Sequence, residues 1–155
     1  MKRLLFVCLG NICRSAAAEE VFRTQAARAG RSQEFEADSA GMIDFHEGEL
    51  PDARMRAHAA RRGYRLTHRS RPVRPADFAR FDLLLPMDAQ NERDLLSLAP
   101  DEAARRKVVP MARFLTRHAS PDIPDPYYGG PEGFDLVLDL LEDACAGLLA
   151  SLSHG

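Results

Sequence analysis

A cysteine and an arginine near the start of the chain are separated by five residues, a spacing that could place both side chains around one phosphate group. These residues are Cys8 and Arg14, and Ser15 follows directly. A thiol attacks phosphorus as the thiolate, a form that a helix N-terminus and a nearby cation both favour. The planar guanidinium of arginine can bind two phosphate oxygens at once. The pair therefore predicts nucleophilic chemistry on a phosphate ester.

The residues around this pair indicate how the chain would hold it. Residues 4–7 form an apolar run typical of a buried strand, which places Cys8 at the carboxyl end of that strand. Gly10 and Asn11 tolerate positive φ, so the loop can turn with its N–H groups facing inward as an anion-binding nest. A helical pattern begins at Ser15, and its free N–H groups and dipole would face the same anion.

Each of these residues also has an ordinary structural interpretation. A cysteine at the end of a strand is usually a small core residue, and a Gly-Asn pair is usually a turn. The combination at fixed spacing, at a junction between a strand and a helix, favours the catalytic interpretation.

The segment 7–15, Val-Cys-Leu-Gly-Asn-Ile-Cys-Arg-Ser, resembles the signature of the low-molecular-weight protein tyrosine phosphatases almost verbatim. The resemblance implies that Cys8 is the nucleophile and that Arg14 binds phosphate. It also implies that Asn11 holds the strained backbone of the loop and that Ser15 donates a hydrogen bond to the thiolate. The phosphate-binding residues would be Leu9, Gly10, Asn11, Ile12, Cys13, Arg14 and Ser15.

A leaving alkoxide or phenoxide needs a proton, and we expect Asp125 to supply it. A well-placed general acid accelerates such a step by roughly 100 to 10,000-fold. Pro124 and Pro126 restrict the loop and would hold the carboxyl group in place. Residues 124–130 could instead form only a turn before the last helix, but they resemble the Asp-Pro-Tyr-Tyr general-acid loop of the same family.

The resemblance also implies the walls of a substrate cleft. Tyr127 and Tyr128 would line one wall, and Phe45 would form the opposite wall. Aromatic rings are suited to hold a phenyl ring between them. The polar neighbours of Phe45 favour an exposed loop over a place in the core. Family members often carry tryptophan or tyrosine there, so the phenylalanine leaves fine substrate preference open.

His68, Asp88 and Asn91 are expected to support the phosphate loop from outside the catalytic set. The resemblance implies a buried pairing between His68 and Asp88, which belongs to a Met-Asp-x-x-Asn segment that begins at Met87. Without the resemblance, His68 would be an ordinary surface or core histidine, and Asp88 would be a helix N-cap.

Apolar runs and helical patterns alternate along the chain. Strands are expected at residues 4–7, 35–39, 81–87 and, weakened by Pro110, 107–111, and helices at 15–30, 51–62, 88–98 and 131–152. This alternation predicts an α/β fold, a three-layer α/β/α arrangement around a central four-stranded parallel sheet. The phosphate-binding loop would join the first strand to the first helix, beyond the carboxyl ends of the strands, where such folds bind ligands.

Length and charge bound the class of protein. With 155 residues, the chain is expected to form a single low-molecular-weight phosphatase domain over residues 1–155. The formal net charge of -2 gives no electrostatic argument for nucleic-acid or membrane partners. No apolar run is long enough for a bilayer span or a signal peptide, so we expect no membrane partner.

The cysteines indicate a reducing environment. Cys8, Cys13 and Cys145 are too few and too unevenly spaced for a disulfide scaffold, which favours a cytoplasmic location. Cys145 lies in the amphipathic last helix and is interpreted as a core residue. Cys8 and Cys13 share one tight loop, so a disulfide that masks the nucleophile under oxidation is a further hypothesis. We expect no metal at this pair, because no further ligands are suitably spaced.

Six arginines are concentrated in the middle of the chain. Such a cluster is usually a solvated face, and the alternative is a docking surface for acidic or phosphorylated partners. The six are Arg61, Arg62, Arg65, Arg69, Arg71 and Arg74.

Together these residues predict a two-step hydrolysis of phosphotyrosine. The Cys8 thiolate would attack phosphorus, while the loop and Arg14 stabilise the phosphate oxygens. Asp125 would protonate the leaving phenolate and then activate water against the phosphocysteine. We expect no metal or organic cofactor. The predicted substrate is a phosphotyrosine-containing protein, which makes a tyrosine kinase a candidate partner.

Three other functions fit parts of the same pattern. The first is a thioredoxin-coupled arsenate reductase of this fold. Its chemistry resembles a thiol relay that needs two further cysteines in the strand and loop after about residue 80, and this chain has none there. A protein arginine phosphatase tends to have threonine where Ile12 stands, and a phosphotyrosine-against-phosphoarginine assay would separate it. A non-catalytic phosphate-binding or thiol redox module would not need Asp125.

Overall fold

A parallel sheet lies at the centre of the protein. The computed structural model describes residues 1–127 and 129–152. The strands β1 (Lys2–Cys8), β2 (Phe35–Gly41) and β3 (Leu83–Pro86) all run parallel, in the order β2-β1-β3. The first strand is therefore central, and Cys8 lies at its carboxyl end, opposite Gly41 of β2.

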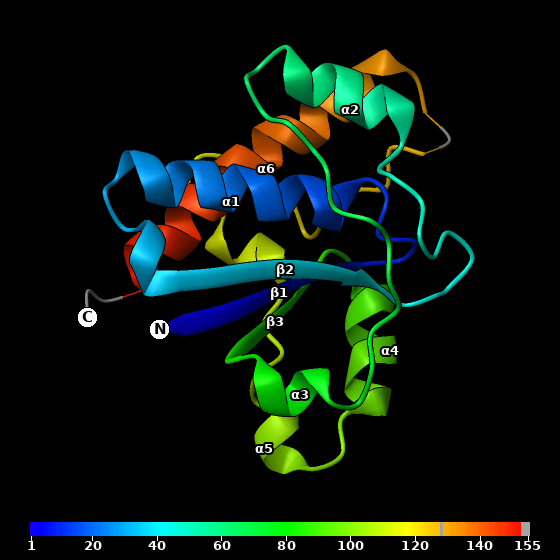
Figure 1. Ribbon diagram of the computed structural model, residues 1–155, viewed down its shortest axis with the longest axis vertical. Coiled ribbons are helices and arrows are strands. Elements are labelled where there is room, and N and C mark those ends of the chain that lie inside the picture. Colours follow the sequence, from blue (N-terminus) through cyan, green and yellow to red (C-terminus); the bar gives the residue numbers. More distant parts are fainter. Residues whose placement is uncertain (128, 153–155) are drawn as a thin grey trace.

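Helices cover both faces of the sheet (Figure 1), as the alternation of strands and helices predicted. The helices on one side are α1 (Arg14–Arg28), α2 (Ala53–Ala60) and α6 (Pro131–Ser151), and those on the other side are α3 (Asp77–Arg80), α4 (Ala89–Leu98) and α5 (Glu102–Arg105). Two short 3-10 turns complete the described elements, η1 (Ser32–Glu34) and η2 (Met111–Phe114).

Alternate side chains of β1 enter two separate apolar clusters. Leu4 and Phe6 are fully buried on the side of α1 and α6. Leu5 and Val7 are fully buried on the side of α3, α4 and α5. A strand whose two faces are both covered needs this continuous apolar run. Burial on both faces fixes the position at which β1 ends, and with it the position of Cys8.

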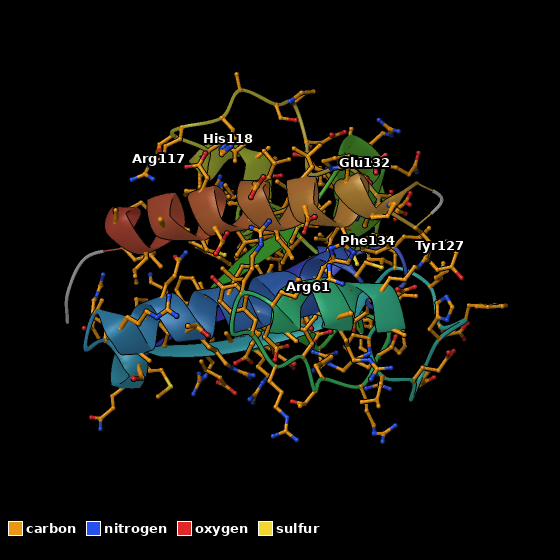
Figure 2. The ribbon with its side chains drawn as sticks, turned by 90° about the horizontal axis from the view of Figure 1, so that it is seen from above. Arg61, Arg117, His118, Tyr127, Glu132 and Phe134 are labelled. Atoms are coloured by element: carbon orange, nitrogen blue, oxygen red, sulfur yellow. The ribbon has the colours of Figure 1, made fainter. Side chains whose placement is uncertain are left out.

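The last helix, α6, packs lengthwise against α1 (Figure 2). Its buried apolar side chains recur at the three-and-four spacing that predicted the helix. They include Phe134, Val137, Leu138, Leu141, Ala144, Cys145 and Leu148. None of the helices formed by the described residues is long and apolar enough to cross a membrane.

The prediction of a fourth strand at residues 107–111 is not confirmed, and the described sheet has three strands. Val108 forms only an isolated parallel bridge to Leu84, whose N–H donates to the carbonyl of Lys107 (2.9 Å). The next rung of this ladder would need an N–H at residue 86, which is Pro86 of β3, whereas the nitrogen of Pro110 faces away from β3. The chain turns directly into η2, so the segment contributes one bridge to the sheet edge.

The start of α2 and the presence of two short helices also differ from the prediction for local reasons. The helix expected from residue 51 begins at Ala53, because the Asp52 carboxylate accepts the backbone N–H groups of Arg54 and Met55 as an N-cap. The short helices α3 and α5 were not predicted. Each has four residues, which is too short to show a helical period.

Candidate active site

The loop that follows β1 leaves its backbone donors free. No backbone N–H of residues 9–13 donates to an acceptor in the described part of the chain. The carbonyl groups of Leu9, Gly10 and Ile12, in contrast, accept hydrogen bonds from Ile43 N–H (3.0 Å), the Ser70 hydroxyl (2.9 Å) and Asp52 N–H (2.8 Å). A loop whose carbonyl groups are bonded within the protein and whose N–H groups are free, followed by a helix N-terminus, is suited to bind an oxyanion.

Asn11 holds the turn of this loop. It is the one described residue other than glycine with positive φ (57°), a region that asparagine tolerates. The side chain is fully buried, and its amide donates to the Ser15 hydroxyl (2.8 Å). Its carbonyl oxygen accepts the Arg71 N–H (3.1 Å) and lies 3.2 Å from His68 Nε2. Asn11 therefore occupies the position that its expected loop-holding role requires.

Gly41, at the end of β2, allows the loop to pass very close to the sheet. A Cβ at this position would lie 2.8 Å from the Leu9 carbonyl oxygen and 3.1 Å from the Asn11 nitrogen, both of which are backbone atoms. No side chain fits there without moving the loop. Sequence reasoning missed Gly41, because a glycine that ends a strand does not reveal which segment passes beside it.

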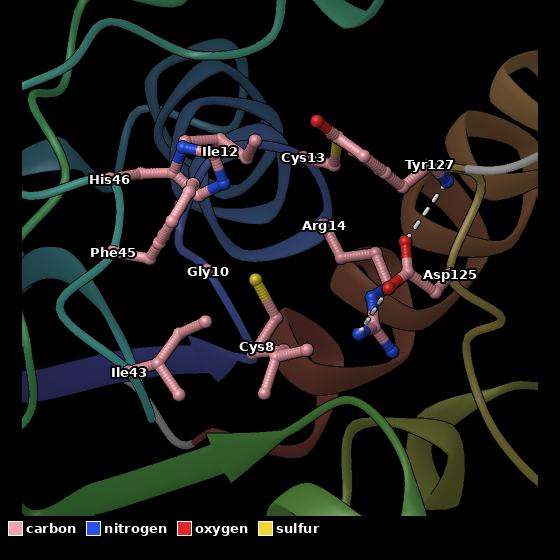
Figure 3. Close-up of a pocket in the computed structure, with 11 residues that line it drawn as sticks. Cys8, Gly10, Ile12, Cys13, Arg14, Ile43, Phe45, His46, Asp125 and Tyr127 are labelled. Carbon is pink, nitrogen blue, oxygen red and sulfur yellow. Dashed lines mark hydrogen bonds and ion pairs between the residues drawn. The ribbon is translucent and has the colours of Figure 1, made fainter.

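The two cysteines of the loop have different surroundings. Both are buried, and both are free thiols. Cys8 Sγ lies 3.1 Å from the Ser15 hydroxyl oxygen, within hydrogen-bond distance, and faces the pocket (Figure 3). Burial raises the pKa of Cys13, and the charges of Asp52 and Cys8 raise it further. Cys13 is therefore held as a thiol, and the Cys8–Cys13 disulfide stays a prediction.

Arg14 is fixed in place beside Cys8. Its side chain is 2% exposed, and Nη1 donates to Asp88 Oδ2 (2.7 Å) and to the Ile123 carbonyl (2.9 Å). Burial alone would lower the pKa of Arg14, but the negative charges of Cys8, Asp88 and Asp125 around it raise the pKa above its ordinary value. The loop thus has a permanent cation whose position does not depend on a ligand.

The predicted pairing of His68 with Asp88 is wrong. Asp88 instead binds Arg14 and caps α4 through the Asn91 N–H (2.8 Å). His68 Nδ1 lies 3.3 Å from Glu19 Oε1 and 3.4 Å from Asp38 Oδ1. Asp88 follows β3, whereas Asp38 belongs to β2 on the other side of the central strand, so the two supports of the loop are separate.

Glu19 is the supporting residue that sequence reasoning missed. Its side chain is 4% exposed, Oε1 accepts from the Ser39 hydroxyl (2.8 Å) and Oε2 from Arg23 Nη1 (2.6 Å). Burial raises the pKa of Glu19 to about 7, although Arg23 and Ser39 oppose the shift. Nothing in the sequence distinguishes this glutamate from a solvent-facing residue of α1.

Glu19, Asp38 and His68 form the one group of the described residues whose ligand atoms are close enough to hold a metal ion, within 4.8 Å of one another. Their arrangement also has an explanation without a metal. The imidazole Nδ1 faces both carboxylates, while Nε2 faces Asn11, so the cluster is linked by hydrogen bonds to the phosphate loop. Burial lowers the pKa of His68, with Arg71 and Arg23 acting in the same direction and Asp38 against them.

Asp125 lies across the pocket from the loop. It belongs to the segment before α6, and its Oδ1 accepts the Tyr127 N–H (3.0 Å). Its Oδ2 lies 3.6 Å from Arg14 Nη2, and 39% of the side chain is exposed. Asp125, Arg14 and Cys8 therefore surround one pocket (Figure 3), although they come from distant parts of the sequence.

The pocket around Cys8 has a volume of about 290 Å³ and largely apolar walls. Phe45 is 78% exposed, so it is a rim residue as expected and not a core aromatic. Tyr127 lines the pocket, and Figure 2 shows it at the same end of the molecule as Phe134. Tyr128, expected beside it, lies outside the described residues.

His46 is a further lining residue that sequence reasoning used only as evidence for an exposed loop. Its ring is 4.8 Å from that of Phe45, at 83°, and 6.4 Å from that of Tyr127. Nδ1 lies 3.0 Å from Glu49 Oε2. His46 therefore stands between the two aromatic walls of the pocket (Figure 3).

Comparisons with known proteins identify relatives of the chain. The family model described as low molecular weight phosphotyrosine protein phosphatase matches residues 3–155. A putative low molecular weight protein-tyrosine-phosphatase of Synechocystis sp. is 47% identical over 150 residues, covering 97% of this chain and 96% of that protein. A low molecular weight protein-tyrosine-phosphatase of Streptomyces coelicolor is 45% identical over 152 residues, covering 97% of this chain and 93% of that protein.

A solved structure agrees with these relatives. The crystal structure of a protein tyrosine phosphatase from Entamoeba histolytica matches the fold with a TM-score of 0.95 at 44% identity, covering 97% of this chain and 96% of that one. The family resemblance of residues 7–15 and 124–130 is therefore confirmed. The chain belongs to the low molecular weight phosphotyrosine protein phosphatase family.

Proposed function

We propose that this chain hydrolyses phosphotyrosine in proteins through a phosphocysteine on Cys8, with Arg14 as the phosphate ligand and Asp125 as the general acid and base. The observation that carries the proposal is the set of free backbone N–H groups at residues 9–13, placed around a buried thiol and next to a fixed guanidinium. Donors arranged in this way match the oxygens of a phosphoryl group as its charge is redistributed.

The first step transfers the phosphoryl group to the enzyme. The Cys8 thiolate donates an electron pair to phosphorus, an S–P bond forms, and the bond from phosphorus to the tyrosine oxygen breaks. The loop N–H groups and Arg14 bind the remaining phosphate oxygens throughout. The phenolate takes its proton from the Asp125 carboxyl, which stands on the open side of the same pocket.

The second step releases phosphate. A water molecule attacks phosphorus on the side that the tyrosine has left, and the Asp125 carboxylate takes its proton. The S–P bond breaks, and its electron pair returns to Cys8 as a thiolate. The Ser15 hydroxyl, 3.1 Å from Sγ, stabilises that thiolate by a hydrogen bond.

The walls of the pocket favour an aryl phosphate. Phe45 and Tyr127 lie on opposite sides of the opening, and we propose that Tyr128 extends the second wall. A phenyl ring between these faces would place the phosphoryl group at the depth of Cys8. His46 would contact the edge of the same ring or the residues beside it.

Cys8→Ser is the direct test of the proposal. A hydroxyl at this position is not ionised near neutral pH, so we expect turnover of para-nitrophenyl phosphate and of a phosphotyrosine peptide to be abolished while inorganic phosphate still binds. Cys145→Ser, in the last helix, is the control for loss of a thiol. Turnover that survives in Cys8→Ser would reject the mechanism, and preferred hydrolysis of a phosphoarginine peptide by the native chain would reassign the substrate.

We also propose that residues 1–155 act as a single domain in the cytoplasm, on proteins that a tyrosine kinase has modified. The family model supports one unit, because it matches residues 3–155 without a break. The three cysteines, Cys8, Cys13 and Cys145, are all free, which suits a reducing compartment.

A further inference from the structure

A second groove opens beside the pocket that contains Cys8. It has a volume of about 440 Å³ and shares Ile12, His46 and Tyr127 with the first pocket as a common wall. Arg56 and Arg69 also line it. A peptide whose phosphotyrosine enters the first pocket must cross this wall or run beside it, so residues that flank the phosphotyrosine come within reach of the groove.

The carboxylates of this groove already have partners. Glu49 Oε2 lies 3.0 Å from His46 Nδ1. Asp52 is bound by the Arg54 guanidinium (2.9 Å) and also accepts backbone N–H groups at the start of α2. Arg54 thus offsets the charge of Asp52, and the two arginines outnumber the one remaining acid of the groove, Glu49.

Arg56 and Arg69 are held by carbonyl groups and not by acids. Arg56 Nε donates to the Pro51 carbonyl (2.9 Å), and Arg69 Nη1 donates to the Gly48 carbonyl (2.9 Å). Both side chains belong to exposed residues, and no carboxylate of the described residues lies within 4.0 Å of either guanidinium. A carbonyl orients a guanidinium without neutralising it, so each arginine keeps its charge and free donors.

The neighbouring arginines of the central cluster differ in this respect. Arg62 binds Asp139 (2.9 Å) and Glu142 (2.7 Å), and Arg71 binds Asp38 and Asp77 (both 3.1 Å). Arg74 lies 3.6 Å from Glu47. The cluster is therefore not a uniform basic face. Of its six arginines, Arg69 lines the groove, and Arg56 from α2 adds a second guanidinium there.

We infer that this groove is a subsite for an acidic side chain, aspartate or glutamate, of the substrate segment that flanks the phosphotyrosine. The inference rests on the proposed function, since the phosphotyrosine must occupy the first pocket. A guanidinium binds a carboxylate through paired hydrogen bonds, which suits both arginines. Exposed ion pairs are weak and depend on salt, so we expect a preference of about threefold to tenfold at low ionic strength.

Two phosphotyrosine peptides of equal length test the inference. One carries glutamate on both sides of the phosphotyrosine, and the other carries glutamine at the same positions. For the native chain we expect kcat/KM for the glutamate peptide to exceed that for the glutamine peptide by about threefold to tenfold. The ratio should approach one in Arg56→Gln/Arg69→Gln, with each single variant in between. Arg65→Gln is the matched control, because this exposed arginine lines neither cavity, and it should keep the native ratio.

The outcomes separate the two proposals. Hydrolysis of the glutamine peptide tests the phosphatase function alone, and a chain that hydrolyses neither peptide overturns both. A native ratio of one, or a native ratio that persists in the double variant, overturns the subsite alone. If the double variant does not fold, the native ratio measured with added salt decides, because it should approach one at about 0.5 M sodium chloride.

Discussion

Two loops of this protein are each held by a buried acid on a helix, yet they use their hydrogen-bond donors in opposite ways. Residues 116–118 surround Asp143 of α6, whose side chain is 3% exposed, and Figure 2 shows Arg117 and His118 beside that helix. Asp143 accepts the three backbone N–H groups of this loop (2.9 to 3.2 Å), the Thr116 hydroxyl (2.9 Å) and His118 Nδ1 (3.0 Å).

The phosphate loop is supported from behind by Glu19 but keeps its own donors. Glu19 is bound by Ser39 and Arg23, and it is linked to the loop through His68 and Asn11. The loop N–H groups at residues 9–13 stay free for a ligand. In the structural loop the backbone N–H groups donate to the protein itself. In the phosphate loop the carbonyl groups and side chains hold the loop in place, and the N–H groups remain available to a ligand.

The electrostatic outcome differs accordingly. Burial alone would raise the pKa of Asp143, but the donors from His118, Thr116 and Arg117 lower it far below the usual range. Glu19 has fewer donors, and burial raises its pKa to about 7. The number of donors around a buried carboxylate, and not burial alone, thus decides whether it stays ionised.

The largest expected effect is the loss of activity when Arg14, at the end of the phosphate loop, is replaced. Arg14→Lys keeps the charge but loses the planar pair of donors, so we expect kcat/KM for para-nitrophenyl phosphate to decrease by about 1,000-fold. Arg62→Lys is the matched control, since Arg62 also binds two carboxylates but lies away from the pocket. Equal losses in the two variants would show that guanidinium geometry at the pocket has no special role.

The next effect concerns the leaving group. Asp125→Asn keeps an acceptor for the Tyr127 N–H but removes the proton donor, and we expect a decrease in kcat of about 100-fold or more for phenyl phosphate. For a substrate with a good leaving group, kcat should decrease much less. Asp122→Asn, three residues earlier, is the control. Equal slowing of both substrates would remove Asp125 from the acid role.

Asp143→Asn tests the structural loop. An amide cannot satisfy the donors that converge on this carboxylate, so we expect the free energy of unfolding at neutral pH to decrease by about 3 kcal/mol. The folded fraction should keep its kcat/KM. Asp139→Asn, which removes an exposed partner of Arg62, should cost less than about 1 kcal/mol in the same urea titration. A loss of catalysis larger than the loss of folded protein would contradict the division between the two loops.

The smallest expected effect is the pH dependence that Glu19 causes. The ordinary pKa of glutamate is 4.5, and between this pH and about 7 the folded chain keeps a proton on Glu19 that the unfolded chain releases. This group therefore lowers the free energy of unfolding as the pH rises through that window. In Glu19→Gln the decrease should be absent, so stability relative to the native chain should rise by about 2 kcal/mol from pH about 5 to about 8.

Urea titrations at several pH values measure this difference. His68, whose pKa is lowered by burial, contributes in the opposite sense, with stability that is lost as the pH falls. Because its Nδ1 lies 3.3 Å from Glu19 Oε1, the comparison is repeated in His68→Asn, where this contribution is absent. Glu102→Gln, at an exposed position of α5, is the control and should run parallel to the native chain. A parallel curve for Glu19→Gln would refute the raised pKa.

Local sequence predicted the phosphate loop, and the family resemblance added Asp125 and the aromatic walls from distant segments. Both failed for the residues that support the loop from behind. Cys8, Arg14 and Ser15 could be placed because the end of a buried strand and the start of a helix fix them locally. The pairing of His68 was wrong because it depends on the side of β1 to which each residue folds. Glu19 and Gly41 were missed because burial and close approach do not appear in residue type.

The same distinction explains the sheet. The alternating elements predicted strands β1, β2 and β3, and the apolar runs of β1 and β3 need two covered faces. The segment 107–111 has apolar residues as well, but Pro86 of β3 lacks the donor that a further rung to this segment would need. A single residue that lacks an N–H therefore decided between a fourth strand and one bridge.

The free N–H groups of the phosphate loop also have a consequence after the reaction. In the proposed reaction these N–H groups would bind the three oxygens that the ester and the released phosphate have in common, so we expect inorganic phosphate to compete with substrate for the same donors. Tetrahedral oxyanions of similar size, such as sulfate, vanadate and arsenate, should compete too. The rate of turnover in a medium rich in phosphate is then governed by how well the aromatic walls hold the tyrosine ring, since only that part of the substrate distinguishes it from its own product.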